Sequence, residues 1–306
     1  MLFVVSAIAE GQILLFSKTE GFRHASIVDG VSMVTSLAAD EGLSLVATED
    51  ATAFNDANLA AFSVVVWLST TGDVLSATQE SAFQRFIEAG GGWVGIHAAA
   101  DCEYGWPWYG DLLGNDAWFD SHPAIQQARL TVESYSHPAS DSLAKSFLFL
   151  DEWYNFQSNP RPLVDVVLTI DETSYDPGAG AMGGDHPIAW WHDSGAGRVF
   201  YTTLGHRPQT YTDTGFREHV RGGLLWAAGL LVCKHPASPV IENLSITSEE
   251  SFSACEVMTV RDLEVFGPAG HAILEAADGV SFEDGFAVGV DGRLTVITGR
   301  SIYEAP

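Results

Sequence analysis

Short apolar runs alternate with segments of helical periodicity along the first hundred residues. The runs are almost uniformly apolar, as in strands that are covered on both faces of a sheet. The segments between them repeat apolar residues every three or four positions, which predicts amphipathic helices. The predicted strands are Gln12–Phe16, Leu43–Thr48, Ser63–Leu68 and Trp93–Ile96. Alternation of strands and helices with short connections predicts an α/β fold with a doubly wound parallel sheet.

The helix predicted before the fourth strand has signals at both ends. Ser76 and Gln79 form a capping-box pattern, which satisfies free backbone amides at the start of a helix. Phe83 and Ile87 follow at helical spacing, and the glycines at 90–92 end the helix. The fourth predicted strand follows these glycines directly.

The segment between residues 101 and 159 breaks the alternation, because it is rich in aromatic residues and has no clear period. Strand patterns resume after it and are followed by one more helix. The strands are Val164–Ile170, Ile188–Trp191 and Arg198–Thr203, and the helix lies near Phe216–Leu231. The α/β domain is therefore predicted to span residues 10–234.

The composition changes after Lys234. Pro236 and Pro239 mark a linker, and the remainder is rich in glycine and β-branched residues without a helical period. We therefore predict a linker and a small all-β module in residues 235–306. The segment Val280–Val296 resembles the small stacked-β repeats appended to secreted bacterial proteins, which favours an accessory or attachment role.

The charge of the chain limits its partners. Asp and Glu number 40 against 14 Lys and Arg, which gives a formal net charge of −26. A surface this acidic repels phosphate backbones and anionic lipid, so nucleic-acid and membrane-surface partners are disfavoured. No apolar run approaches the roughly 18 residues of a membrane-spanning helix. The apolar share of 46% is typical of a globular chain and argues against disorder.

The N-terminus and the cysteines bear on export. Residues 1–9 are apolar and end in an Ala-x-Ala pattern, as in the remnant of a secretory signal peptide. The basic segment of such a signal is missing, and a frayed first strand is the alternative. Cys233 and Cys255 are candidates for a disulfide in an exported protein, which leaves Cys102 free. These features favour a secreted or periplasmic bacterial protein.

Three histidines follow predicted strands of the sheet. His24 comes after the first strand, His97 after the fourth and His206 after the last. Ligands of open parallel sheets bind beyond the carboxyl ends of the strands. We therefore expect these imidazoles to meet in one crevice at that edge, with His97 at its floor.

His97 ends a buried strand within the pattern Gly-Ile-His-Ala-Ala, which is typical of a nucleophile elbow. Imidazole is a poor nucleophile for a covalent ester intermediate, so ordinary acyl transfer is disfavoured. A histidine in this place is suited to act as a general base or as a metal ligand. Cys102, five residues later, is a rival nucleophile.

Several motifs resemble the trehalose-utilisation (ThuA-like) family in their order along residues 12–230. They are Phe22-Arg23-His24, Gly95–Asp101, Ser121-His122-Pro123, Asp151–Tyr154, Asp185–Trp190 and Leu204-Gly205-His206. The resemblance implies a flavodoxin-like fold of the class I glutamine amidotransferase type. It places His97 where the amidotransferases have their cysteine and His206 where they have their histidine. Pro208 stands at the position of their acidic residue, which argues against amidotransferase activity.

The resemblance also implies a carbohydrate substrate, such as a glycoside oxidised to a 3-keto sugar. The leading hypothesis is a lyase or glycoside hydrolase that uses acid–base or metal-assisted chemistry. Its candidate catalytic residues are His24, His97, Asp101, Glu152 and His206. Its candidate substrate-binding residues are Arg23, Trp106, Trp108, Trp118, His122, Tyr154 and His186. A divalent metal, with zinc as the first choice, is a candidate cofactor, and its ligands would be His97, Glu152 and His206.

Different observations select these residues. Tryptophan rings can stack on sugar faces, and the aromatic residues gather in an irregular segment. Only one of Asp151 and Glu152 can face a pocket from an extended segment, and the family pattern favours Glu152. His122 and His186 precede proline, so a structural role is the alternative for both. A secreted sugar-binding or attachment protein without catalysis is the alternative function.

Overall fold

The computed structural model of the protein describes residues 12–233, 235, 238–299 and 303–304. The contacts divide the chain into two units. The larger unit comprises Met1–Glu133 and Ala144–Leu230, and the smaller comprises Ser134–Leu143 and Leu231–Pro306. The signal-peptide hypothesis for residues 1–9 and the linker residue Pro236 lie outside the described residues.

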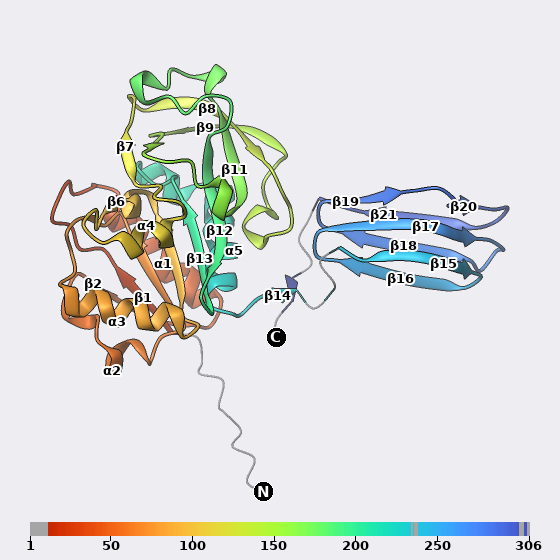
Figure 1. The fold of residues 1–306 in the computed structure, drawn as a ribbon, viewed down its shortest axis with the longest axis horizontal. Helices are drawn as coiled ribbons and strands as arrows, with labels where there is room; N and C mark the ends of the chain where they lie inside the picture. The colour runs from red at the N-terminus through yellow and green to blue at the C-terminus, as the bar shows by residue number, and fades with distance from the viewer. Residues whose placement is uncertain (1–11, 234, 236–237, 300–302, 305–306) are drawn as a thin grey trace, which may run out of the picture. The chain divides into compact units, whose positions relative to one another are not determined.

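A nine-stranded sheet forms the centre of the larger unit (Figure 1). Its strand order is β2-β1-β3-β5-β13-β12-β11-β8-β9. The first five strands in this order pair in parallel, and the pairs from β13 to β9 are antiparallel. The strands are β1 (Gln12–Phe16), β2 (Ser44–Thr48), β3 (Val64–Leu68), β5 (Gly92–Ile96), β8 (Gln126–Val132), β9 (Ser146–Asp151), β11 (Asp165–Asp171), β12 (Pro187–Ser194) and β13 (Gly197–Thr202). The predicted parallel sheet is confirmed, and it carries an antiparallel extension that the sequence analysis did not predict.

Two of the unpredicted strands, β8 and β9, lie in the segment that shows no clear period. In both strands more buried and more exposed residues alternate, so that one face of each strand is more exposed than the other. Such half-exposed strands lack the uniformly apolar runs that mark β3 and β5. The weaker pattern explains why they were missed.

Helices cover both faces of the parallel part. On one face Arg217 of α5 (Thr214–Ala227) forms an ion pair of 2.6 Å with Asp40 of α1 (Ile27–Asp40). On the other face Phe83 of α3 (Ala77–Glu88) stacks on Trp67 of β3. The capping box of Ser76 at the start of α3 is present as predicted. Among the described residues no helix is both long and apolar enough to cross a membrane.

Short elements complete the larger unit. The remaining helices are α2 (Asp56–Leu59) and α4 (Pro107–Leu113), and the remaining strands are β4 (Thr71–Gly72), β6 (Asp101–Cys102), β7 (Phe119–Ser121) and β10 (Asn155–Phe156). The 3₁₀ turns of this unit are η1 (Ala51–Ala53), η2 (His97–Ala100), η4 (Arg161–Leu163), η5 (Glu172–Ser174), η6 (Gly178–Gly180) and η7 (Pro208–Thr212), and η3 (Pro138–Ser140) belongs to the smaller unit.

The smaller unit is an all-β module, as predicted. The strands from β15 to β19 alternate between two sheets with parallel pairing. One sheet is ordered β15-β17-β19 with β20 also beside β17, and the other is ordered β16-β18-β21. Apolar side chains from both sheets, such as Met258 and Leu274, form one core. The strands are β14 (Val232–Cys233), β15 (Val240–Ile246), β16 (Glu249–Ala254), β17 (Val257–Val265), β18 (His271–Ala276), β19 (Gly279–Phe282), β20 (Ala287–Val288), β21 (Arg293–Ile297) and β22 (Tyr303–Glu304).

The cysteines are arranged as predicted. Cys233 and Cys255 form a disulfide within the smaller unit. Cys102 is a free thiol, and its side chain is buried in the core of the larger unit. Burial raises the pKa of this thiol far above its usual value, which disfavours the thiolate that a nucleophile requires. The rival nucleophile considered in the sequence analysis is therefore not supported.

Substitution of Gly92 by alanine is expected to destabilise the larger unit by about 1–3 kcal/mol, because the new methyl group overpacks the core. A Cβ at this position of β5 would overlap with the carbonyl group of Ala227 at the end of α5, and backbone atoms cannot rotate away. All nine tryptophans lie in the larger unit, so urea unfolding followed by tryptophan fluorescence measures the change. Gly184→Ala is the control, since its Cβ would have no neighbour within 4 Å. Equal midpoints for the two variants would contradict the prediction.

Candidate functional site

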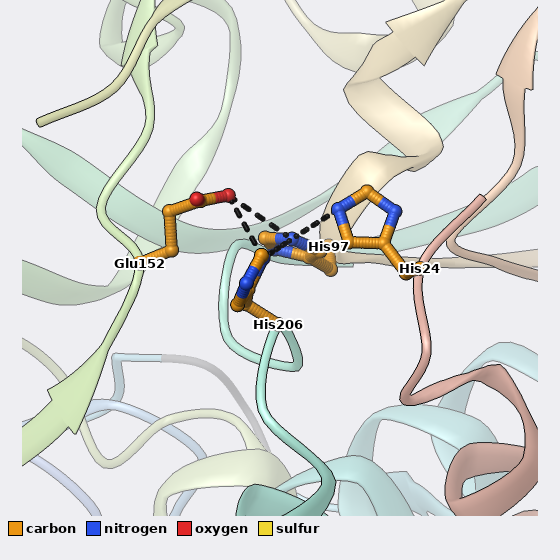
Figure 2. A group of neighbouring side chains, drawn as sticks. All are labelled: His24, His97, Glu152 and His206. Atoms are coloured by element: carbon orange, nitrogen blue, oxygen red, sulfur yellow. Dashed lines mark hydrogen bonds and ion pairs between the residues drawn. The ribbon is translucent and has the colours of Figure 1, made fainter. Parts of the chain in front are cut away.

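Histidines from three separate strand ends meet at the carboxyl edge of the sheet (Figure 2). His24 lies between β1 and α1, His97 follows β5 directly, and His206 follows β13. The Nε2 atom of His97 lies 3.2 Å from Nε2 of His24 and 3.3 Å from Nδ1 of His206. The structure thus brings together the imidazoles that the rule for parallel sheets predicted to meet.

The backbone of His97 makes the sharp turn that the elbow pattern predicts. Its φ of 53° is uncommon for a residue with a side chain. Nδ1 of the ring lies 2.7 Å from the carbonyl oxygen of Thr203 and donates its proton there, so the lone pair of Nε2 faces the other imidazoles. Gly205, with a φ of 129°, passes so close that a Cβ would lie 3.3 Å from Cβ of His97 and 2.7 Å from the hydroxyl of Tyr211. A glycine is therefore required beside the elbow.

Glu152 adds a carboxylate to the three imidazoles. Its Oε2 atom lies 3.0 Å from Nδ1 of His206 and 3.6 Å from Nε2 of His97. Its Oε1 atom lies 3.1 Å from Nδ1 of His122. The acidic partner that is missing at Pro208 is thus supplied by the connection between β9 and β10.

The neighbouring carboxylate, Asp151, has a different task. It is fully buried and accepts hydrogen bonds from the amide of Gly205 at 2.9 Å and from the hydroxyl of Thr210 at 3.0 Å. It also accepts the amide proton of Glu152. Asp151 therefore ties the loop that carries His206 to the segment that carries Glu152, a role that the sequence analysis missed.

Burial separates the protonation states of the imidazoles. His97 is fully buried and His24 is 5% exposed. Burial lowers the pKa of His97 well below its usual value and, with the nearby His206, lowers the pKa of His24 to about 4. The hydrogen bond to the Glu152 carboxylate instead raises the pKa of His206. His24 and His97 are therefore neutral at pH 7, and His206 is the imidazole most disposed to hold a proton.

Tyr154, predicted to bind substrate, also reaches the cluster. Its hydroxyl lies 3.2 Å from Nε2 of His97, and the two rings pack with centroids 4.5 Å apart. Burial raises the pKa of this phenol well above its usual value, so the hydroxyl remains a proton donor. The cluster meets solvent through His206, whose side chain is 22% exposed, and through His122, at 42%.

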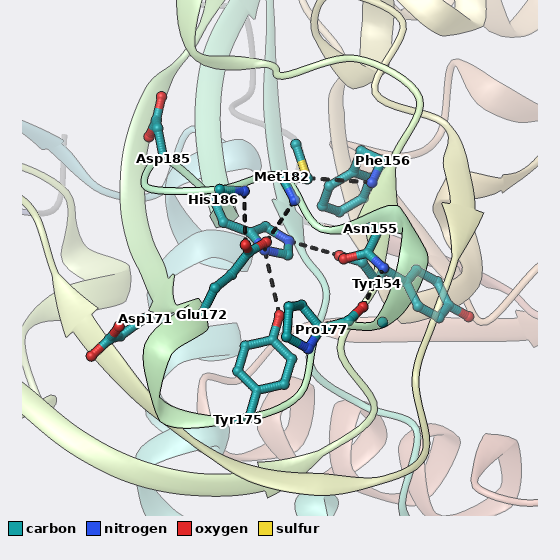
Figure 3. Close-up of polar contacts among 12 residues, drawn as sticks. Tyr154, Asn155, Phe156, Asp171, Glu172, Tyr175, Pro177, Met182, Asp185 and His186 are labelled. Atoms are coloured by element: carbon teal, nitrogen blue, oxygen red, sulfur yellow. Dashed lines mark hydrogen bonds and ion pairs between the residues drawn. The ribbon is translucent and has the colours of Figure 1, made fainter.

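His186 supports the site from outside (Figure 3). Its Nε2 atom lies 2.8 Å from the carbonyl oxygen of Tyr154, and its Nδ1 atom lies 2.9 Å from Oε1 of Glu172. Glu172 in turn accepts the amide protons of Met182 at 2.6 Å and Gly183 at 2.7 Å. His186 thus holds the backbone of Tyr154, which agrees with the structural alternative for this residue. Glu172 had no signal in the sequence.

Two other candidates lie beside the cluster without joining it. One carboxylate oxygen of Asp101 accepts a hydrogen bond of 2.6 Å from the hydroxyl of Tyr104. Arg23 forms a surface ion pair of 2.6 Å with Glu49. In the described part of the chain neither side chain forms a hydrogen bond or ion pair with His24, His97 or His206, so the roles of Asp101 and Arg23 remain predictions.

The tryptophans require a correction. Trp106 and Trp118 are only 9% and 8% exposed and belong to the hydrophobic core. The ring of Trp106 stacks on that of Trp108, which is partly buried, with centroids 4.9 Å apart. Core side chains cover Trp106 and Trp118, which disfavours stacking of these two rings on a sugar. Trp108 is partly buried, and its role in substrate binding stays a prediction. A high density of aromatic residues indicates burial as readily as binding.

In the part of the chain that the structure describes, two groups of side chains have the composition of a metal site. The ligand atoms of His24, His97, Glu152 and His206 lie within 4.8 Å of one another. These include the three residues predicted to bind zinc, with His24 as a fourth. Carboxylates of Asp73, Glu80 and Glu103 form the other group.

Glu103 of the second group is expected to make stability depend on pH. Its side chain is buried, and its Oε1 atom accepts the amide protons of Val74 and Leu75 at 2.9 Å. Burial, together with the charges of Asp73 and Glu80, raises its pKa from 4.5 to about 7. The unfolded chain ionises at the lower value, so this group lowers the free energy of unfolding as the pH rises from 4.5 to 7, by up to about 3 kcal/mol.

Replacement of Glu103 by glutamine removes this titration while keeping an acceptor for both amides. The variant should therefore gain stability relative to the native protein as the pH rises from 4.5 to 7.5, as measured by urea unfolding at several pH values. Glu250→Gln, at an exposed position of the smaller unit, is the control. A difference between native protein and Glu103→Gln that stays constant with pH would contradict the prediction.

Comparison with known proteins adds the family. The ThuA family, described as trehalose utilisation, matches residues 12–227. A ThuA-like protein from Bacteroides uniformis is similar in structure, with a TM-score of 0.62 and 26% identity over 72% of this chain and 93% of that chain. A ThuA-like protein from Parabacteroides merdae has a TM-score of 0.56 and 21% identity over 71% of this chain and 89% of that chain. Among curated proteins no sequence matches this one.

These matches cover the larger unit. The family match ends at residue 227, so it lends no support to the expected likeness of residues 280–296 to repeats of secreted bacterial proteins. The matched region contains every residue of the histidine cluster together with Glu152. The chain belongs to the ThuA family of trehalose utilisation.

Proposed function

We propose that this protein is a carbohydrate-active enzyme whose reacting centre is Glu152 with its imidazole partners. Membership of a trehalose-utilisation family indicates a function related to carbohydrates. The observation that carries the proposal is the position of the Glu152 carboxylate, which lies between His206 at 3.0 Å and His122 at 3.1 Å. Both imidazoles are partly exposed, so the centre is open to a ligand on that side.

The arrangement suits proton transfer at carbon. In a 3-keto glycoside the carbonyl acidifies the proton on C2, and one carboxylate can remove it. Glu152 would accept this proton while a C1–C2 double bond forms and the bond from C1 to the glycosidic oxygen breaks. His206, whose pKa is raised, would donate a proton to the departing oxygen. The products are an unsaturated keto sugar and an alcohol, which makes the enzyme a lyase.

Hydrolysis of the same bond is the second candidate reaction. It uses the same acid, but water adds to C1, so that the product is a saturated sugar. Most glycosidases need two carboxylates on opposite sides of the bond. The cluster contains one carboxylate with three imidazoles, which favours elimination.

A panel of native and 3-oxidised glycosides tests the proposal. We expect turnover of an oxidised glycoside with a product that absorbs in the ultraviolet and whose mass is that of the sugar minus water. A product of full mass without the absorbance would indicate hydrolysis. Binding without turnover of any glycoside would replace the proposal by the alternative of a non-catalytic sugar-binding protein.

We also propose that the protein is exported to a secreted or periplasmic location. The disulfide between Cys233 and Cys255 supports this, because disulfides persist in oxidising compartments. Fractionation of the native cells followed by alkylation and mass measurement tests it. One labelled thiol in the periplasmic or extracellular fraction is expected, and three labelled thiols in a cytoplasmic protein would refute it.

A further inference from the structure

Four side-chain atoms of the cluster surround one point. They are Nε2 of His24, Nε2 of His97, Nδ1 of His206 and Oε2 of Glu152, and all lie within 4.8 Å of one another. Adjacent pairs are 3.0 Å apart for His206 and Glu152, 3.2 Å for His24 and His97, and 3.3 Å for His97 and His206. Figure 2 shows the four side chains converging from separate segments of the chain.

These separations match those between the ligands of a tetrahedral metal ion. Zinc binds imidazole nitrogen and carboxylate oxygen at about 2.0–2.2 Å, which places neighbouring ligand atoms of a tetrahedron about 3.3 Å apart. The widest of the assigned contacts, between His97 and Glu152, is 3.6 Å. Four of the six separations among these atoms are therefore close to those of a tetrahedral site, and the other two, from His24 to His206 and to Glu152, lie within 4.8 Å.

Hydrogen bonds alone do not account for the packing around His97. Its Nδ1 proton is engaged by the carbonyl of Thr203, so its Nε2 atom offers a single lone pair. Three groups compete for that lone pair, namely His24 and Tyr154 at 3.2 Å and His206 at 3.3 Å. A cation at the centre would use every inward lone pair at once.

We propose that His24, His97, His206 and Glu152 bind one divalent transition-metal ion, with zinc as the first choice. Imidazole ligands favour zinc and its neighbours over magnesium and calcium, which prefer oxygen. Nε2 of His24 and Nε2 of His97 lie 3.2 Å apart, as two ligands of one ion would. Glu152 brings one negative charge, which offsets part of the charge of the ion.

The surroundings of the four ligands resemble those of established metal sites. The carbonyl of Thr203 fixes the ring of His97, and Nδ1 of His122 contacts the oxygen of Glu152 that does not face the centre. Such outer contacts orient metal ligands and set their affinity. Because only Oε2 of Glu152 is assigned to the ion, Oε1 and His122 remain at the exposed side for proton transfer. A metal-bound Nδ1 of His206 holds no proton, so in the metal-bound form His122 takes the place of His206 as the proton donor.

Metal analysis of the full-length, tag-free protein tests the site. We expect about one zinc ion per chain after dialysis, and after removal with a chelator we expect one Zn²⁺ to rebind in competition with a chromophoric chelator. Cobalt in place of zinc should give the visible absorption of a tetrahedral ion. His24→Ala and His97→Ala should each lower zinc affinity by about 100-fold or more. His271→Ala, in the smaller unit, is the control and should leave affinity unchanged.

Two outcomes would overturn the site. One is substoichiometric zinc in the native protein both as isolated and after titration. The other is an equal loss of affinity in His271→Ala and His97→Ala, which would mean adventitious binding. Circular dichroism of each variant shows whether it is folded, and the stoichiometry of the native protein decides the question if a variant is not. Metal binding is measured without a substrate, so its result is independent of the test of the reaction. The protein can fail to bind zinc and still turn over a glycoside, or bind zinc and turn over none.

Discussion

Replacement of Glu152 by glutamine is expected to lower kcat/KM for the carbohydrate substrate by about 10³-fold. The change keeps the size and shape of the side chain but removes the negative charge that lies 3.0 Å from His206. The carboxylate can then no longer accept the proton from carbon. Loss of the charge also weakens the interaction that raises the pKa of His206, so a smaller fraction of His206 holds the proton that the leaving oxygen needs.

The measurement is initial rates of product formation with the oxidised glycoside, at several substrate concentrations. The native protein and Glu152→Gln are assayed with and without added zinc. Added zinc should restore a rate that was lost through weaker metal binding, but not one that was lost with the proton acceptor. Glu88→Gln, at an exposed position on α3, is the control and should match the native protein. Product formation by Glu152→Gln at the native rate would remove Glu152 from the reaction.

The histidine cluster shows how far strand patterns lead toward a site. Short runs rich in apolar residues marked β1, β5 and the strand before His206, and parallel strands end at a common edge of the sheet. Those two facts are sufficient to predict that His24, His97 and His206 converge. They do not give distances, because loop conformation decides whether the rings touch.

The choice between Asp151 and Glu152 depended on the family pattern. An extended segment alternates its side chains, so one carboxylate had to turn inward, but alternation alone does not say which. In the structure Glu152 faces the cluster, and Asp151 faces the amide of Gly205. Gly205, the partner of Asp151, lies 54 residues away along the chain, and no local sequence pattern predicts such a contact.

The burial of the tryptophans and the presence of the antiparallel strands could not be predicted from the sequence for a common reason. Whether Trp106 is covered depends on Phe83 and other rings from distant segments. Likewise, the half-exposed strands β8 and β9 are fixed by their pairing and not by an apolar run of their own. Tertiary contacts decide both features, and a pattern of residue types contains only weak information about them.

Replacement of Asp151 by alanine is expected to destabilise the larger unit by about 2–4 kcal/mol and to impair the reaction as well. The buried carboxylate accepts protons from Gly205, Thr210 and Glu152, and each buried donor that loses its acceptor carries a cost. Part of this cost is offset, because the native protein must bury the charge of Asp151. This burial raises the pKa of the Asp151 carboxyl, and the alanine variant avoids it. His206 follows Gly205 directly, so release of that amide lets the imidazole move away from Glu152.

Graded variants separate this positioning role from a loss of folding. Thr210→Val removes one of the three hydrogen bonds and should lower the free energy of unfolding by about 1 kcal/mol. Asp151→Asn keeps an acceptor oxygen, so its loss of stability should lie between those of Thr210→Val and Asp151→Ala. Urea unfolding gives the stabilities, and activity is measured at temperatures where every variant is folded. If Asp151 positions His206, turnover should be highest in Thr210→Val, lower in Asp151→Asn and lowest in Asp151→Ala. Full activity in folded Asp151→Ala would show that the loop holds His206 in place without this carboxylate.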